Sequence, residues 1–160
     1  MAITGGLLLA VAAGAIAQST PKRAARIVLF STGRPETHSY LTEAFRMAMR
    51  ELGYVEGRDV VYSYRWADGR MDRVSQLASE IARDNPDIVI TGTALSTRAV
   101  VEAAPGAAVV MAYGSDPVGN QLVASLARPG GRVTGLSNLG EGIVPKMLEL
   151  LRAMVPKAGR

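Results

Sequence analysis

Hydrophobic residues along this chain gather in short runs that are separated by longer stretches with helical spacing. Residues 26–31, 87–91 and 107–112 are short, mainly apolar runs, which are typical of strands buried on both faces of a sheet. Residues 60–66 alternate large side chains with Val61, Ser63 and Arg65, which is the two-residue period of a strand. Residues 132–134 are predicted to form a fifth strand.

Between these runs, apolar side chains recur every three or four residues, which predicts helices with one apolar face. The first face consists of Leu41, Ala44, Phe45, Ala48, Met49 and Leu52. The second consists of Val74, Leu77, Ala78 and Ile81, and the third of Leu95, Ala99, Val100 and Ala103. Gly53, Pro86 and the Pro105–Gly106 pair are expected to end these helices. A last helix is predicted over residues 141–156, with apolar residues Met147, Leu148, Leu150, Leu151 and Met154.

Strands and helices alternate along the chain at a spacing that favours crossover helices between parallel strands. The predicted fold is therefore α/β, an open doubly wound parallel sheet. In such a sheet, ligands bind outside the carboxyl ends of the strands. That rule makes the loops that follow the strands the place to search for a site.

Three of these loops carry polar residues and should meet at one edge of the sheet. They are Ser31–Gly33, Thr91–Ala94 and Gly114–Asp116. Each loop also has a purely structural interpretation. Ser31 and Thr32 are suited to turning the chain or capping the next helix, and Asp116 before Pro117 is an ordinary turn residue.

The ligand-binding interpretation of these loops describes an α-amino acid. Thr93 is a common N-cap residue, and the N–H groups of Thr93 to Ser96, including that of Ala94, would favour an anion such as a carboxylate. Asp116 would hold an ammonium group through a charge-assisted hydrogen bond. Tyr113, at the end of its strand, is a candidate for contact with a ligand ring. The candidate ligand-binding residues are Ser31, Thr32, Thr93, Ala94, Tyr113 and Asp116.

Other aromatic residues and the single histidine are given structural interpretations. Tyr62, Tyr64 and Trp66 are expected to pack against neighbouring helices. His38 is expected to be a solvated residue near the start of a helix, because one imidazole without Cys or a carboxylate cluster is a poor metal site.

Composition narrows the function further. The chain has 160 residues, of which 48% are hydrophobic and 20% charged, as expected for one globular domain. Its net charge of +4 is spread along the chain, so a nucleic-acid patch is not expected. With no Cys, thiolate chemistry is excluded. No dinucleotide, P-loop or nucleophile-elbow motif is present, so we predict no catalytic residue, no metal and no cofactor.

The first residues form a separate segment. Residues 3–16 are uncharged, and Ala15-Ile16-Ala17 has the small-residue pattern of a signal-peptidase site. We predict a signal peptide over residues 1–17, a flexible leader over 18–25 and a periplasmic location. A membrane anchor or a buried helix is the alternative, and the usual basic residues before the apolar run are missing.

Several segments together resemble the substrate-binding proteins of a bacterial ABC transporter family whose studied members carry aromatic amino acids. The most specific are Ser115-Asp116-Pro117-Val118 and the run from Leu122 to Ser137. Shorter matches are Phe30–Gly33, Glu51–Arg58 and Tyr64–Gly69. The resemblance covers the chain from about Arg26 to its end.

This resemblance implies a lobe of the type I periplasmic-binding-protein kind, with ligand held between two lobes and an ABC permease as partner. Residues 26–138 would form the N-terminal lobe, and residues 139–160 the crossover helix toward a second lobe that this chain lacks. Aromatic amino acids as ligands are likewise an implication of the family. Two rival functions stay open from the residues alone, the ligand-sensing domain of a receptor and a doubly wound enzyme of unknown reaction.

Overall fold

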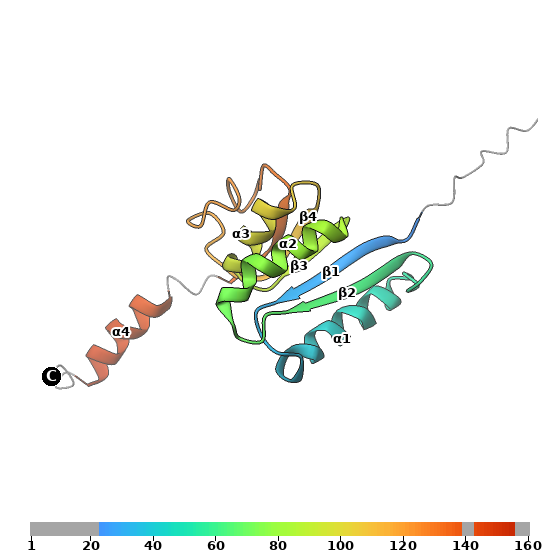
Figure 1. Ribbon diagram of the computed structural model, residues 1–160. Helices are drawn as coiled ribbons and strands as arrows, with labels where there is room; N and C mark the ends of the chain where they lie inside the picture. Colours follow the sequence, from blue (N-terminus) through green and yellow to red (C-terminus); the bar gives the residue numbers. More distant parts are fainter. Residues whose placement is uncertain (1–22, 139–142, 156–160) are drawn as a thin grey trace, which may run out of the picture.

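A single parallel sheet organises the chain. The computed structural model describes residues 23–138 and 143–155, and its five strands lie in the order β2-β1-β3-β4-β5 (Figure 1). The strands are β1 (Ala25–Ser31), β2 (Val60–Trp66), β3 (Ile88–Thr91), β4 (Ala108–Ser115) and β5 (Val133–Asn138). The helices are α1 (Pro35–Glu51), the short 3-10 helix η1 (Met71–Arg73), α2 (Val74–Asp84), α3 (Ala94–Ala103) and α4 (Ile143–Met154). The predicted α/β order is confirmed.

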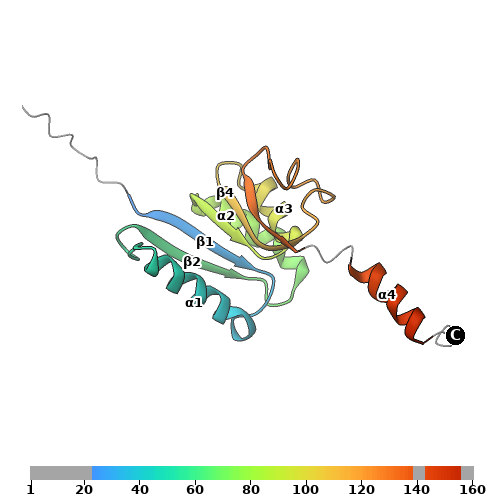
Figure 2. The same ribbon diagram turned by 180° about the vertical axis from the view of Figure 1, so that it is seen from behind.

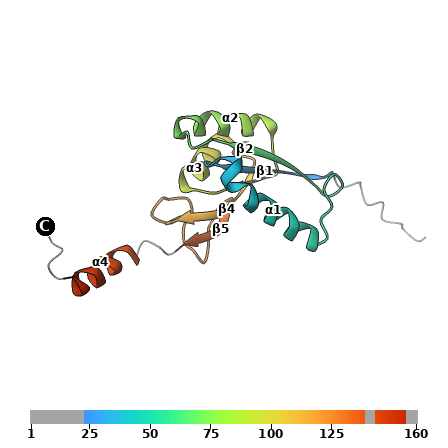
Figure 3. The same ribbon diagram turned by 90° about the horizontal axis from the view of Figure 1, so that it is seen from below.

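Helices cover both faces of the sheet, as a doubly wound fold requires, with α2 and α3 on one side and α1 on the other (Figure 3). The α2–α3 side holds the larger core, which includes Val28, Phe30, Val89 and Val109 of the central strands. The four apolar residues predicted for α2 are all buried. That helix ends at Asp84, and Asn85 follows it in the left-handed conformation, one residue before Pro86.

The α1 side holds a smaller core. Phe45 and Met49 of α1 pack against Ile27 and Leu29 of β1, and the Phe45 ring meets the Tyr62 ring edge-on at 5.9 Å. Tyr62 and Tyr64 both pack here, as predicted.

Four residues of the predicted α1 face, namely Leu41, Ala44, Ala48 and Leu52, are exposed and are not part of this core. Leu41 is 52% exposed and Leu52, which follows the helix, is 74% exposed, so the expectation that they are buried was wrong. Helical spacing identifies one side of a helix, but only the part of that side that lies over the sheet becomes buried. For α1, that part consists of Phe45 and Met49, which are partly buried against the sheet, and no residue of this helix is fully buried.

The second half of the sheet extends further than the sequence predicted. β4 continues to Ser115 and β5 to Asn138, past a register shift between Met111 and Gly114. At this shift Gly135 lies against β4 with φ of +141°. A Cβ atom on Gly135 would be 2.0 Å from the carbonyl oxygen of Met111. Only glycine allows this approach, which explains the residue's place in the Val-Thr-Gly-Leu-Ser run.

The side chain of Arg132, directly before β5, caps the C-terminal end of α3. The guanidinium of Arg132 donates hydrogen bonds to the carbonyl oxygens of Val101, Ala104 and Ala107. The last carbonyls of a helix have no partner within it, so this half-buried cation satisfies those of Val101 and of the C-cap residue Ala104, and it also interacts favourably with the negative end of the helix dipole. Arg132 therefore joins β5 to α3.

Apolar side chains of α4 and β5 are open to solvent. α4 stands apart from the sheet (Figures 1 and 2), and its residues Met147, Leu148 and Leu151 are more than half exposed. Leu136 of β5 is 72% exposed. Within the described part of the chain, no helix is long and apolar enough to cross a membrane.

We predict that Gly135→Ala lowers the free energy of unfolding by about 3 kcal/mol, since it adds backbone strain and a clash with the Met111 carbonyl. The control is Gly106→Ala, because a Cβ at Gly106 would meet nothing within 4 Å. Urea unfolding of both variants checks the prediction. Equal stability of the two would contradict the close approach of β5 to β4.

Candidate functional site

The carboxyl ends of β1, β3 and β4 lie side by side. β3 lies between the other two, and all three strands run parallel, with Phe30 opposite Thr91 and Thr91 opposite Met111. The three polar loops predicted to form a site are therefore neighbours at one edge of the sheet. The structure confirms that they meet, while the binding role of each residue stays a prediction.

The first loop is fixed by hydrogen bonds to the loop after β2. The Ser31 hydroxyl accepts from the Gly33 N–H at 3.1 Å, so Ser31 does turn the chain. The carbonyl oxygens of Thr32 and Gly33 accept from the N–H groups of Gly69 and Asp68 at 2.9 and 3.1 Å. These bonds fix the backbone around Thr32 beside the carboxyl ends of the strands. Thr32 itself is half-buried.

His38 belongs to this region, which the sequence analysis missed. It is half-buried, and its ring lies over Gly33, where a Cβ atom would be 2.4 Å away. The ring Nδ1 is 2.7 Å from the Thr37 hydroxyl. The expected place near the start of a helix is confirmed, and the side chain is partly rather than fully exposed. The position of His38 in the sequence was the available signal. It follows the first loop by five residues, and the first turns of α1 bring its ring back over that loop.

The second loop presents the N-terminus of α3. The Thr93 hydroxyl accepts from the Ser96 N–H, and the Ser96 hydroxyl accepts from the Thr93 N–H, both at 3.2 Å. This capping box confirms Thr93 as the N-cap. It also corrects the expectation that the N–H groups of Thr93 to Ser96 are all free, because two of the four are engaged. The N–H groups of Ala94 and Leu95 are the ones that remain for a ligand.

A buried pair of hydroxyl groups supports this helix start from below. Thr91, at the end of β3, and Thr97, in the first turns of α3, are fully buried. Their hydroxyl oxygens are 2.7 Å apart, and the Thr97 hydroxyl also donates to the Thr93 carbonyl at 2.7 Å. The pair therefore joins the strand end to the helix cap and fixes the direction of the first turn.

The third loop is a tight turn built by Asp116. One carboxylate oxygen accepts from the Gly119 N–H at 2.6 Å, and the residue has φ of +39°. The Asn120 side chain donates to the Asp116 carbonyl at 2.9 Å, and the Asn120 carbonyl accepts from Arg98 of α3 at 2.6 Å. The turn interpretation of Asp116 is confirmed. The Arg98 contact ties this turn to the helix that carries the second loop.

The carboxyl end of β4 is partly exposed to solvent. Tyr113 is 67% exposed, Ser115 is exposed and Asp116 is half-buried. Among the described residues, no group of three or more His, Asp and Glu could hold a metal ion. The edge thus offers two N–H donors, one carboxylate and an exposed ring, a set suited to binding a small polar molecule.

Comparison with known proteins identifies the class. The family described as ABC transporter substrate binding protein matches residues 37–160. A tyrosine-binding protein from Clostridioides difficile (strain R20291) is 30% identical over 116 residues, which are 72% of this chain and 33% of that protein. The chain belongs to the ABC transporter substrate-binding protein family.

Solved structures share the fold. A conserved domain protein from Vibrio cholerae matches with a TM-score of 0.71 and 27% identity, over 84% of this chain and 45% of that one. A ligand-free, open substrate-binding protein with adhesive properties from Clostridium difficile matches with a TM-score of 0.67 and 26% identity, over 84% and 45%. A domain from Streptococcus pneumonia in complex with L-Trp matches with a TM-score of 0.65 and 20% identity, over 85% and 55%.

These comparisons confirm the predicted family and the periplasmic-binding-protein type of fold. The chain is shorter than these proteins. Its match spans 33% of the length of the tyrosine-binding protein and 45% to 55% of the length of the solved chains.

We predict that Thr97→Val destabilises the lobe by about 1–3 kcal/mol, because it leaves the buried Thr91 hydroxyl without its partner. Thr97→Ser keeps the hydroxyl and should lose less. Urea unfolding of the two variants measures the difference. A Val variant that is at least as stable as the Ser variant would show that the hydroxyl pair does not support the helix start.

Proposed function

We propose that this chain is the N-terminal ligand-binding lobe of an ABC importer's solute-binding protein, and that its ligand is an α-amino acid. The observation that carries the proposal is the arrangement of the β3 and β4 loops. The N–H groups of Ala94 and Leu95 would receive the ligand carboxylate at the positive end of α3. Asp116, on the adjacent strand end, would receive the ammonium group.

The geometry of Asp116 is compatible with both of its roles. Only one of its carboxylate oxygens accepts the Gly119 N–H. The second lies where a Cβ atom on Gly119 would be 1.7 Å away, so the absence of that atom leaves room for the carboxylate in the turn. The same turn is tied to α3 through Arg98, which keeps the anion and cation subsites in a fixed relation.

An aromatic side chain is our proposal for the rest of the ligand. Tyr113 presents an exposed ring at the end of β4, and ring–ring contact adds about 0.5–1.5 kcal/mol beyond area burial. Ser31 and Thr32, at the other side of β3, would supply hydroxyl groups. The names of one relative, a tyrosine-binding protein, and of one solved complex with L-Trp support the same ligand class.

Binding without catalysis is the mechanism that we propose. Two lobes would close on the ligand by a hinge motion, and an ABC permease in the inner membrane would recognise the closed form. This chain spans half or less of the length of two of its relatives, which leaves room in such proteins for a second lobe. The exposed apolar side of α4 supports its role as the helix that leads to the second lobe and packs there.

We predict that Asp116→Asn weakens amino-acid binding about 10- to 100-fold, since one charge-assisted hydrogen bond is worth about 1.5–3 kcal/mol. The Asn side chain keeps an oxygen that can accept from Gly119, so the turn should survive. Calorimetric titration with L-Tyr and L-Trp measures the effect in a two-lobed protein that contains this lobe.

The control for this experiment is Asp72→Asn, which removes an exposed carboxylate paired with Arg70, and which should bind normally. A second control is 3-phenylpropionate, which lacks the ammonium group and should bind the wild type and the Asp116→Asn variant equally. Undiminished binding of L-Tyr and L-Trp by the Asp116→Asn variant would remove Asp116 from the site.

Export to the periplasm through a cleaved signal peptide over residues 1–17 is also a proposal, and these residues lie outside the described part of the structure. Residues 18–22 of the predicted leader lie outside it too. We predict a mature N-terminus at Gln18, after the Ala15-Ile16-Ala17 pattern. Mass spectrometry of the periplasmic protein tests this, and recovery of intact Met1 in the cytoplasm would refute it.

A further inference from the structure

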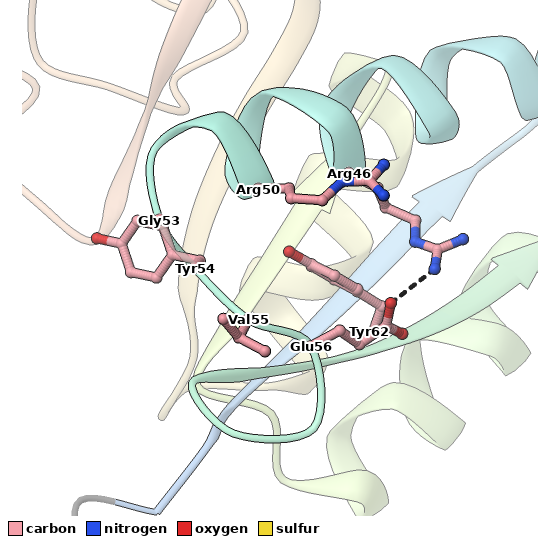
Figure 4. Close-up of a pocket in the computed structure, with 7 residues that line it drawn as sticks. All are labelled: Arg46, Arg50, Gly53, Tyr54, Val55, Glu56 and Tyr62. Atoms are coloured by element: carbon pink, nitrogen blue, oxygen red, sulfur yellow. Dashed lines mark hydrogen bonds and ion pairs between the residues drawn. The ribbon is translucent and has the colours of Figure 1, made fainter.

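A hollow lies at the opposite edge of the sheet, far from the loops discussed above. It is formed where α1 ends and the chain turns back into β2 (Figure 4), and its volume is about 230 Å³. The lining residues are Arg46, Arg50, Gly53, Tyr54, Val55, Glu56 and Tyr62. It therefore has guanidinium groups on the helix side and tyrosine and valine side chains on the other sides.

The two arginines of this hollow differ in their ion pairing. Arg46 donates to Glu56 at 2.6 Å and to Glu43 at 3.1 Å, and these carboxylates raise the pKa of its guanidinium further above the ordinary value. Arg50, one turn later, makes no side-chain hydrogen bond or ion pair with any described residue. Both carboxylates of this cluster, Glu43 and Glu56, pair with Arg46, so Arg50 is the guanidinium of the lining that has no carboxylate partner among the described residues.

The C-terminus of α1 has few free carbonyl groups that would repel an anion bound near Arg50. The carbonyl oxygens of Ala48, Met49 and Arg50 accept from the N–H groups of Leu52, Tyr54 and Gly53 at 2.9 to 3.0 Å. A helix C-terminus normally repels anions through its free carbonyl groups. Here three of those groups are already engaged, so the Arg50 charge is not cancelled by the last turn.

The remaining wall is apolar and aromatic. Tyr62 is half-buried, and burial raises the pKa of its hydroxyl, so the ring stays neutral at physiological pH. Val55 and Tyr54 are 46% and 47% exposed. On the same face of β2, the Tyr64 hydroxyl is buried with no hydrogen-bond partner among the described residues. Such a group favours a water molecule or a ligand atom nearby.

We propose that this hollow binds a small carboxylate that carries an aryl or branched alkyl group. The carboxylate would pair with Arg50, whose planar guanidinium matches it in a bidentate way. The apolar group would lie against Tyr62 and Val55. Pockets for drug-sized ligands measure about 300–1,000 Å³, so a hollow of about 230 Å³ suits a molecule of the size of phenylacetate. This site is independent of the proposed amino-acid site.

The test is an NMR titration of the 160-residue chain with phenylacetate, 2-phenylethanol and 2-phenylethylamine. We expect phenylacetate to shift the amide signals of residues 53–56 and 62, with weaker responses to the alcohol and the amine. Arg50→Gln should weaken phenylacetate binding about threefold, the scale of an exposed ion pair. The matched control is Arg83→Gln, because Arg83 holds the equivalent place in the last turn of α2 and should not matter.

A third variant, Glu56→Gln, is expected to change the affinity for phenylacetate in the opposite direction. Glu56→Gln removes one of the two carboxylates that pair with Arg46 and the one carboxylate that lines the hollow, so it should tighten phenylacetate binding about threefold. Equal affinities for the wild type, Arg50→Gln and Glu56→Gln would overturn the proposal, as would stronger binding of the amine. Shifts confined to residues 93–95 and 113–116 would also overturn it, because they would place the ligand at the other edge.

Discussion

Parallel pairing of β1, β3 and β4 is the constraint on which the candidate site depends. Parallel strands can be connected only by crossovers, so every strand must end at the same edge, and the loops that follow it must start there. The loops after Ser31, Thr91 and Ser115 thereby become neighbours, although they lie far apart in the sequence. No single loop carries both the proposed anion subsite and the proposed cation subsite. Their combination is a product of the strand order.

Local hydrogen bonds then give this edge its shape. The capping box engages the N–H groups of Thr93 and Ser96 and leaves those of Ala94 and Leu95, while the buried Thr91–Thr97 pair joins the helix to the strand end. Asp116 is held by its own turn. Because these groups are positioned before any ligand arrives, less conformational entropy has to be lost on binding. This preorganisation is the structural basis of the proposed function.

The two edges of the lobe differ in their chemistry. The carboxyl edge combines a helix N-terminus with a carboxylate, as a zwitterion requires, whereas the edge near Arg50 carries a cation beside aromatic and aliphatic groups. This difference follows from the fold, because one edge presents the starts of α2 and α3 and the other presents the end of α1. Net charge alone, +4 for the chain, would not separate the two.

The sequence by itself determined the order of strands and helices, the buried face of α2 and the N-cap at Thr93, because hydrophobic period and capping are local properties. It also indicated the family, through the Ser115–Val118 and Leu122–Ser137 segments. Tertiary structure alone decided which part of the α1 face is buried, how far β4 and β5 extend past Gly135, and that His38 lies over Gly33. Each of these depends on contact between segments that approach only in the folded chain.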